Sequence, residues 1–414
     1  MKRVVVQWPR FGPYHLARLR AAHSFFGGRG VELVGLETAG SDATYAWRIE
    51  SGATPFRREQ VFPGRVFEDL KPAEIHTHVL NRLEELDPDA VAITSYSTPD
   101  ARACLYWCRS RRRTAVLMSA SKEDDAPRSV LREYLKSRLV RQFDAALVGG
   151  SPQRAYCEKL GVPPKSVFDG YDVIDNDYFA AGAEEARSCP DRYRHLPGLD
   201  HDAPFFLASG RFVARKNLDG LLRAYGYYRA QVPAPWRLVL LGDGPERQRL
   251  TEQVRTTAIE GVTFSGFRQI DEIPAYYGLA DVFVHPAFME QWGLVVNEAM
   301  AAGLPVLVSE HAGCAQDLVQ DGENGFRFDP ADAPTLARLM VQIASDSSLR
   351  TRMGERSRAI ISDWGPERFA KGLWQAIEAG SARCQRSFNP VARTALLGLN
   401  LATRDVSAFH AIAE

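Results

Sequence analysis

Short runs of apolar residues alternate with longer stretches of helical spacing along nearly the whole chain. In the first half the apolar runs cover residues 3–8, 31–37, 89–94, 114–118 and 145–148, with helical stretches that include residues 73–86 and 99–109 between them. Uninterrupted apolar runs are typical of parallel strands that are buried on both faces. The alternation therefore predicts βαβ units and an open parallel sheet.

The second half repeats this rhythm. Its predicted strands cover residues 205–209, 236–241, 262–264, 282–285 and 305–309, and its predicted helices cover residues 218–231, 245–256, 271–278, 294–302, 334–344 and 366–379. Residues 180–203 are rich in Ala, Gly, Pro and charge, which is typical of a linker. We predict an α/β chain with two Rossmann-like, doubly wound parallel-sheet domains that face a cleft. They comprise residues 1–185 and 203–379, and the tail, about 380–414, packs back on the first.

Composition excludes several classes of protein. The chain has 414 residues, enough for two cores, and a formal net charge of zero, which gives no indication of a nucleic-acid partner. The six cysteines include no Cys-x2-Cys pair, so no zinc or redox motif is supported and a reduced, cytoplasmic setting is the simplest account. We expect neither a leader peptide nor a membrane span. The basic cluster from Arg109 to Arg113, with Arg132, Lys136, Arg138 and Arg141 downstream, could contact anionic lipid at the inner face of a membrane or an acidic acceptor, or form a solvated helix face and turn.

Two carboxylates bracket a loop-to-helix turn after the predicted strand 282–285. A helix that begins near Gly293 would direct its free amides and positive dipole end at the space above the strand ends. Glu290 would stand at the mouth of that site, and Glu298 about one and a half turns into the helix. A nucleotide sugar, with hydroxyls at both ends and phosphates between them, fits such a site. The spacing alone is weak evidence, because two surface glutamates would give the same pattern.

Two further loops follow predicted strands of the second half. Gly210 permits a tight turn after strand 205–209, and Arg211 and Lys216 then stand at the carboxyl end of that strand. Arginine grips phosphate through paired donors and lysine adds a compact charge, although a solvated basic loop would look the same. Phe267 and Arg268 follow strand 262–264 and could offer groups to a nucleotide base.

The order of these segments resembles the donor-binding domain of the large GT-B glycosyltransferase family usually called family 4. The matching segments are Gly-Arg-Phe-Val-Ala-Arg-Lys-Asn (210–217), Leu-Gly-Asp-Gly-Pro-Glu (241–246), Glu-x7-Glu-Ala-Met-Ala-Ala-Gly-Leu-Pro-Val (290–306) and Asp-Gly-Glu-Asn-Gly-Phe (321–326). The resemblance implies retaining, metal-independent transfer of a hexose-type sugar from a nucleotide diphosphate sugar. UDP is the commonest nucleotide, and GDP or ADP stay open. The acceptor would be a hydroxyl of a glycan, a glycolipid precursor or a small metabolite, and no cofactor would be bound permanently.

The resemblance also implies residue roles. Arg211 and Lys216 would hold the diphosphate, Glu298 the ribose, and Glu290 the hydroxyls of the donor sugar. Fixed cations and a helix N-terminus would stabilise the negative charge of the departing nucleoside diphosphate. The predicted catalytic residues are Arg211, Lys216 and Glu290, and the predicted binding residues are Gly12, Gly210, Phe267, Arg268, Trp292, Gly293, Leu294 and Glu298.

The first half departs from the family pattern at two places. Gly12, between Phe11 and Pro13, resembles the glycine loop of the family, which often has two adjacent glycines; His15 just after it is assigned to the start of a helix. After strand 114–118 many members carry a histidine that contacts the donor sugar, whereas this chain has Ser121 and Lys122 there. The acidic triplet 123–125 could bind a divalent metal, but consecutive acids cannot all face one ion, so a capping or solvated loop is predicted.

Three other classes of protein compete with a transferase. A phosphorylase-like enzyme that uses inorganic phosphate would not need a ribose-binding Glu298. A dinucleotide-dependent oxidoreductase requires Gly-x-Gly-x-x-Gly after its first strand, and the chain has only Gly12 there. A catalytically silent nucleotide-binding or scaffold protein of the same fold stays open as the alternative to a transferase.

Overall fold

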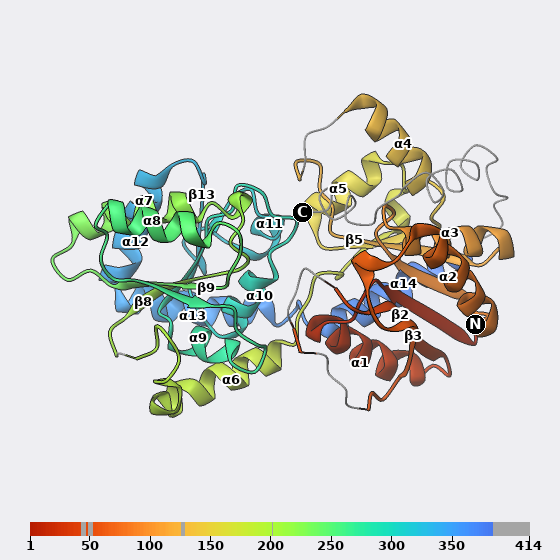
Figure 1. Ribbon diagram of the computed structural model, residues 1–414, viewed down its shortest axis with the longest axis horizontal. Coiled ribbons are helices and arrows are strands. Elements are labelled where there is room, and N and C mark those ends of the chain that lie inside the picture. Colours follow the sequence, from red (N-terminus) through yellow and green to blue (C-terminus); the bar gives the residue numbers. More distant parts are fainter. Residues whose placement is uncertain (43–46, 49–52, 126–128, 201, 384–414) are drawn as a thin grey trace. The chain divides into compact units, whose positions relative to one another are not determined.

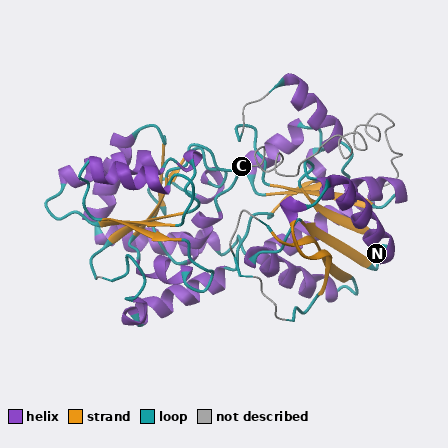
Figure 2. Cartoon of the chain, in the orientation of Figure 1, coloured by secondary structure: helices purple, strands orange, loops and turns teal. Residues whose placement is uncertain are grey.

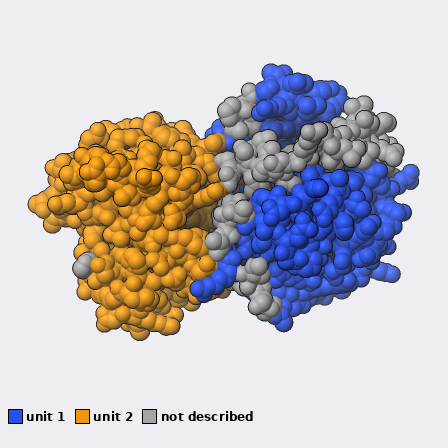
Figure 3. Space-filling view, viewed as in Figure 1, with its two compact units in different colours: residues 1–173, 366–414 blue, residues 174–365 orange. Residues whose placement is uncertain are grey.

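The computed structural model describes residues 1–42, 47–48, 53–125, 129–200 and 202–383. The chain divides into two compact units (Figure 3). Unit 1 comprises Met1–Val173 with Pro366–Glu414, and unit 2 comprises Ile174–Gly365. Each unit is built on its own parallel sheet with helices on both faces (Figures 1 and 2).

Unit 1 contains a seven-stranded sheet in the order β3-β2-β1-β4-β5-β6-β7, with all neighbours parallel. Its strands are β1 (Arg3–Trp8), β2 (Glu32–Ser41), β3 (Arg57–Val66), β4 (Ala90–Thr94), β5 (Thr114–Ser119), β6 (Ala145–Val148) and β7 (Val167–Asp169). Its α-helices are α1 (Pro13–Gly27), α2 (Pro72–Leu86), α3 (Pro99–Arg111), α4 (Val130–Val140), α5 (Ser151–Lys159) and α14 (Pro366–Ser381). Successive residues of β1 alternate between two cores: Val5 packs with α2 and α3, and Val4 and Val6 pack with α1 and α14.

Unit 2 contains a six-stranded sheet in the order β10-β9-β8-β11-β12-β13. Its strands are β8 (Phe205–Ser209), β9 (Arg237–Leu241), β10 (Val262–Gly266), β11 (Val282–His285), β12 (Val306–Ser309) and β13 (Gly325–Phe328). Its α-helices are α6 (Asn176–Ser188), α7 (Leu218–Gln231), α8 (Arg247–Thr256), α9 (Ile273–Leu279), α10 (Leu294–Ala301), α11 (Ala315–Leu318), α12 (Ala333–Ser345) and α13 (Ser347–Ile361). Because the strand order reverses between β8 and β11, their carboxyl ends mark the place where such sheets bind ligands.

The predicted class of two doubly wound parallel sheets is confirmed. The units divide elsewhere than predicted, however. The stretch 180–203 was expected to be a linker, but α6 continues into it as far as Ser188 and packs on α9 within unit 2, burying Phe179 and Ala183. Helix α14 was assigned to the second domain, but its apolar face, with Phe369 and Leu373, lies in the core of unit 1. Most of the predicted tail, residues 384–414, lies outside the described residues.

Candidate active site

The loops that follow β8 and β11 meet where the strand order of unit 2 reverses. The side-chain amide of Asn217 donates to the carbonyl of Pro286 over 3.0 Å, and the backbone amide of Phe288 donates to the carbonyl of Arg215 over 2.9 Å. Asn217 is buried and has a φ of 53°, a left-handed conformation that asparagine tolerates better than most residues. These bonds hold the basic loop after β8 against the loop after β11.

Lys216, Glu290 and His285 form a buried cluster at this junction. The ammonium group of Lys216 pairs with Oε2 of Glu290, and Nε2 of His285 lies 3.3 Å from the same oxygen. Burial alone would raise the pKa of Glu290, but the charge of Lys216 and the neighbouring His285 together hold it below its usual range. Burial lowers the pKa of His285. At neutral pH the cluster therefore contains an ionised carboxylate, an ammonium group and a neutral imidazole.

Gly293 allows the chain to pass close over this cluster. Its φ is 105°, in the left-handed region that favours glycine. A Cβ atom at this position would lie 3.3 Å from Cγ of Glu290 and 3.4 Å from Nε2 of His285. Gly293 is also the N-cap of α10, and the first amides of any helix have no partner inside it. The first turn of α10, beginning with Leu294, therefore opens beside the carboxylate of Glu290.

Two other predicted residues are buried along α10. Glu298 is 2% exposed and accepts a 2.6 Å hydrogen bond from the hydroxyl of Tyr277 on α9. The indole N–H of Trp292 donates to Oδ1 of Asn297 over 2.9 Å, and its ring packs on that of Trp364 with the centroids 5.2 Å apart. The side chain of Trp292 therefore supports α10, and its backbone carbonyl accepts a 3.1 Å hydrogen bond from the amide of Cys314.

The remaining predicted residues of unit 2 lie on two loops. Gly210 has a φ of 146°, and a Cβ atom there would lie 3.8 Å from Nζ of Lys216. Arg211 follows and is half-buried. Phe267 is 38% exposed after β10, where Arg268 donates to the carbonyl of Ser265 over 2.7 Å. The structure thus brings the loop 210–216 together with the segment 290–298, beside β8 and β11. Phe267 and Arg268 lie two strands away from β8, at the end of β10.

Sequence reasoning gave no role to His285 or Tyr277. His285 ends a strand that was predicted correctly, and a polar residue closing an apolar run was the available signal. Tyr277 lies in the middle of α9, and nothing near it in the sequence indicates a contact with Glu298.

In unit 1, Gly12 is the N-cap of α1 and its amide donates to Nδ1 of His15 over 3.0 Å. Burial, with added repulsion from Arg18 and Arg10, lowers the pKa of His15 to about 3. The ring lies against that of Trp8, with the centroids 4.7 Å apart. His15 thus stands at the start of a helix, where it was predicted, and its neutral ring closes the turn that contains Gly12.

The segment after β5 has no histidine, and its charged residues pair separately. Lys122 is buried and its ammonium group pairs with Asp124, while its backbone amide donates to Asp125 over 3.2 Å. Glu123 pairs instead with Lys159 on α5. The three consecutive acids therefore bind three separate groups, the ammonium groups of Lys159 and Lys122 and the backbone amide of Lys122, which agrees with the capping or solvated loop that was predicted.

The basic cluster 109–113 is largely neutralised. Arg109 is buried and pairs with Asp144, and Arg111 and Arg113 pair with carboxylates at the C-terminal end of α2. These ion pairs do not favour the predicted membrane contact through this region, which stays a prediction. Within the described part of the chain, no helix is long and apolar enough to cross a membrane.

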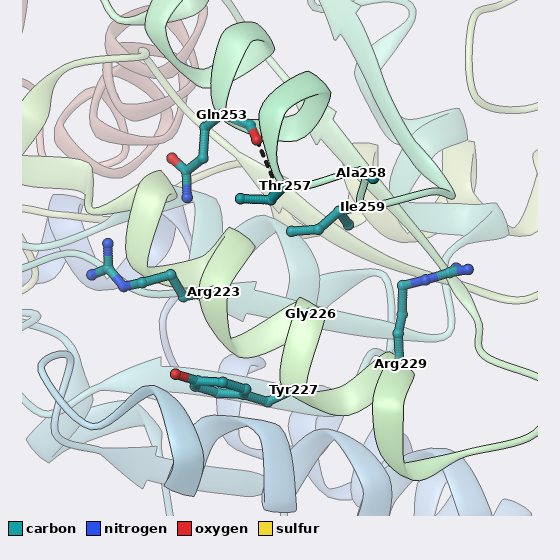
Figure 4. Close-up of a pocket in the computed structure, with 8 residues that line it drawn as sticks. All are labelled: Arg223, Gly226, Tyr227, Arg229, Gln253, Thr257, Ala258 and Ile259. Carbon is teal, nitrogen blue, oxygen red and sulfur yellow. Dashed lines mark hydrogen bonds between the residues drawn. The ribbon is translucent and has the colours of Figure 1, made fainter.

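A separate pocket of about 440 Å³ lies between α7 and the C-terminal end of α8 (Figure 4). Both helices begin at the carboxyl ends of strands and run back along the sheet, so the pocket lies toward the opposite end from Lys216 and Glu290. None of the predicted site residues lines it. The lining residues are Arg223, Gly226, Tyr227, Arg229, Gln253, Thr257, Ala258 and Ile259.

Comparison with known sequences identifies the family. Residues 191–360 match the family described as "Glycosyl transferases group 1". The matched part of the chain, which lies within unit 2, belongs to this family. Over 161 residues it is 39% identical to the lipopolysaccharide core biosynthesis glycosyltransferase LpsE of Rhizobium meliloti, covering 39% of this chain and 45% of that protein. Over 228 residues it is 30% identical to the alpha-D-kanosaminyltransferase of Streptomyces kanamyceticus, covering 55% and 58%. The chain thus spans about half the length of these relatives.

Solved structures agree on the fold. HepE of Anabaena, in complex with UDP and glucose, has a TM-score of 0.69 at 17% identity and covers 91% of this chain and 100% of that one. Sucrose-phosphate synthase from Thermosynechococcus elongatus has a TM-score of 0.68 at 20% identity, covering 91% and 98%. At these identities the likeness concerns the fold alone. The family and the GT-B fold predicted from the sequence are confirmed.

Proposed function

We propose that this group 1 glycosyl transferase moves a hexose-type sugar from a nucleotide diphosphate sugar to a hydroxyl acceptor, with retention of configuration. The observation that carries the proposal is the Lys216–Glu290 pair beside the N-terminus of α10, at the edge of the sheet where open α/β folds bind ligands. An ammonium group, an ionised carboxylate and helix amides in one place suit a ligand with phosphates and sugar hydroxyls. Unit 2 would bind the donor, and unit 1 the acceptor.

In the proposed complex Arg211 and Lys216 bind the diphosphate. Glu290 accepts hydrogen bonds from the donor sugar and Glu298 accepts them from the ribose. As the bond from the anomeric carbon to the diphosphate breaks, negative charge collects on the leaving group, where the two cations and the amides around Leu294 stabilise it. The acceptor oxygen attacks from the same face and its proton passes to the leaving phosphate, so the step needs no metal.

The donor nucleotide proposed first is UDP, and this choice is supported by the UDP and glucose bound to HepE, which has the same fold. GDP is the second choice. The GDP-mannose-dependent phosphatidylinositol monomannoside mannosyltransferase of Mycolicibacterium smegmatis is 31% identical over 193 residues, covering 45% of this chain and 49% of that protein. Phe267 and Arg268, at the end of β10, would lie toward the base. The acceptor would be a saccharide, a lipid-linked saccharide or a small molecule.

The test combines binding with turnover. Calorimetry against UDP, GDP, ADP, TDP and NAD, with and without a chelator, identifies the nucleotide, and release of nucleoside diphosphate from the matching sugar donor measures the reaction. We expect one nucleoside diphosphate to bind without metal and its sugar donor to be turned over. Binding without turnover on any acceptor would favour the catalytically silent alternative, and binding of NAD alone would overturn the proposal.

A further inference from the structure

Helix α4 of unit 1 turns its apolar side to the solvent. Of the nine large apolar side chains that are exposed in the described part of the chain, four lie on this one helix. Val130 is 90% exposed, Leu131 67%, Tyr134 53% and Leu135 55%. At 100° per residue they occupy one continuous arc of the helix surface. A helix on the surface of a globular protein normally buries such an arc.

The side of α4 that faces the protein carries its polar residues instead. Glu133 accepts a 2.8 Å hydrogen bond from the hydroxyl of Tyr156 on α5, and Lys136 lies 3.0 Å from Glu133. Val140, at the C-terminal end, is fully buried and anchors the helix to the core. Leu139, which is partly buried, also packs on this core. The helix is therefore docked by a polar network and two apolar residues at its C-terminal end, and its orientation leaves the apolar arc outward. α4 lies at the periphery of unit 1 (Figures 1 and 3).

Positive charge borders the apolar arc. Arg132 and Arg138 are exposed on α4, and Arg141 is exposed directly after it. The guanidinium of Arg138 lies 4.9 Å from the ring centroid of Tyr134 and donates to its hydroxyl over 2.7 Å. The acid of this helix, Glu133, points inward and is paired. The outward side thus combines apolar side chains with arginines, the combination that binds the surface of an anionic bilayer.

We propose that α4 docks unit 1 onto an anionic lipid surface, with Val130, Leu131, Tyr134 and Leu135 entering the interface and Arg132, Arg138 and Arg141 meeting lipid phosphates. The helix has 11 residues and is about 16 Å long. Its outer face is small beside the roughly 800 Å² that each partner buries in a stable protein interface, so a second copy of the chain is the weaker candidate. The proposal does not depend on the reaction that the protein catalyses.

Flotation of the whole protein with vesicles tests this assignment. The vesicles are phosphatidylcholine alone and phosphatidylcholine mixed with phosphatidylglycerol. We expect binding to the mixed vesicles, weakened by high salt because the arginine contacts are screened. Leu131→Ser with Leu135→Ser should lower the partition coefficient more than about tenfold, because two leucine side chains that would be buried in the membrane interface are lost. Arg132→Gln with Arg138→Gln should lower binding to the mixed vesicles only.

The matched control is Tyr227→Ser in unit 2, which removes an apolar side chain that is 50% exposed and should leave vesicle binding unchanged. The substituted side chains of α4 point outward, so thermal unfolding should match that of the parent. Absence of vesicle binding, or binding that survives both double variants, would overturn the proposal. Size-exclusion chromatography with light scattering tests the alternative occupant. Self-association of the parent that the double leucine variant abolishes would also overturn the proposal, because the apolar arc would then be a contact between two copies of the chain.

Discussion

Nε2 of His285 lies 3.3 Å from Oε2 of Glu290, the oxygen that also pairs with Lys216. With its proton on Nε2, a neutral imidazole would present a hydrogen-bond donor to this carboxylate. Lys216, by contrast, would be shared with the diphosphate in the proposed complex. We therefore expect His285 to keep Glu290 in position when Lys216 turns to the ligand.

The variant His285→Phe tests this positioning role, because it keeps a ring of similar size and removes the nitrogen. We expect kcat to fall about tenfold or more, as for other lost donors near developing charge, while the Kd of the nucleoside diphosphate changes little. His285→Gln can still donate and should recover part of kcat. An equal fall in kcat and nucleotide affinity, with no recovery by glutamine, would indicate a general disturbance of the loop.

Lys216 and Glu290 should be coupled in stability as well as in activity. Their side chains are only 14% and 11% exposed, so Lys216→Met leaves a carboxylate buried without its partner, at a cost of about 3 kcal/mol. Adding Glu290→Gln removes that charge and should recover most of the loss, although activity stays low. Urea unfolding of the four members of the cycle measures the coupling, and strictly additive effects would contradict it.

Glu298 should contribute to nucleotide binding without being required for the fold. Glu298→Gln keeps an acceptor for the hydroxyl of Tyr277 but removes the negative charge, so we expect weaker binding of the nucleoside diphosphate, by roughly tenfold, at nearly unchanged stability. Tyr277→Phe is the control, because it removes the internal hydrogen bond and keeps the carboxylate. Should calorimetry find Glu298→Gln as tight as the parent for UDP, GDP and ADP, the ribose role is lost.

The sequence predicts the parts of the fold that depend on local pattern. The strands that form β1, β6, β8 and β11 were predicted to the residue, because each is a short apolar run closed by a turn. β3 was not predicted, since it is an edge strand with charged residues and Pro63, which an edge tolerates. The unit to which α14 belongs could not be predicted either. Its apolar face could pack on the core of either unit, and only the tertiary structure shows that it packs in unit 1.

The part of the candidate site that lies on one continuous segment of the chain could be predicted from the sequence. Glu290, Gly293 and Glu298 belong to a single loop-to-helix segment, so their proximity follows from helix geometry. The contact of Lys216 with Glu290 joins two loops 74 positions apart and follows from the strand order, which puts β8 beside β11. The neutralisation of the cluster 109–113 was missed, since the acids that pair with it lie elsewhere in the sequence, at the C-terminal end of α2 and directly before β6.

Replacing Gly293 with even the smallest side chain should lower activity. Gly293→Ala introduces strain at a φ of 105° and a Cβ atom 3.3 Å from Glu290 and 3.4 Å from His285, so we expect a large loss of activity. Gly322→Ala is the matched control: its φ is 81°, but nothing lies within 4 Å of the added carbon. Both variants should lose stability by about 1 kcal/mol from backbone strain, and only Gly293→Ala should lose turnover. Comparable turnover in the two variants would show that the close approach of Gly293 to Glu290 and His285 does not matter for activity.

His15 gives the stability of unit 1 a dependence on acid. Its pKa is lowered to about 3 in the folded chain, against about 6.5 for an unfolded histidine, so between these values the unfolded chain binds a proton that the folded chain does not. Stability is therefore fully present above about pH 6.5 and falls as the pH drops, by at most about 1.4 kcal/mol per pH unit, less because His15 is partly exposed.

This dependence can be measured between about pH 6.5 and 5.5, above the range in which ordinary carboxylates titrate. His15→Gln keeps an acceptor for the amide of Gly12 without a titrating ring, so its thermal midpoint should fall less steeply with acid than that of the parent. His195→Gln, at an exposed position of unit 2, should follow the parent. If His15→Gln and the parent lose stability in parallel over this window, a protonated His15 is accommodated in the folded state and the turn at Gly12 does not depend on a neutral ring.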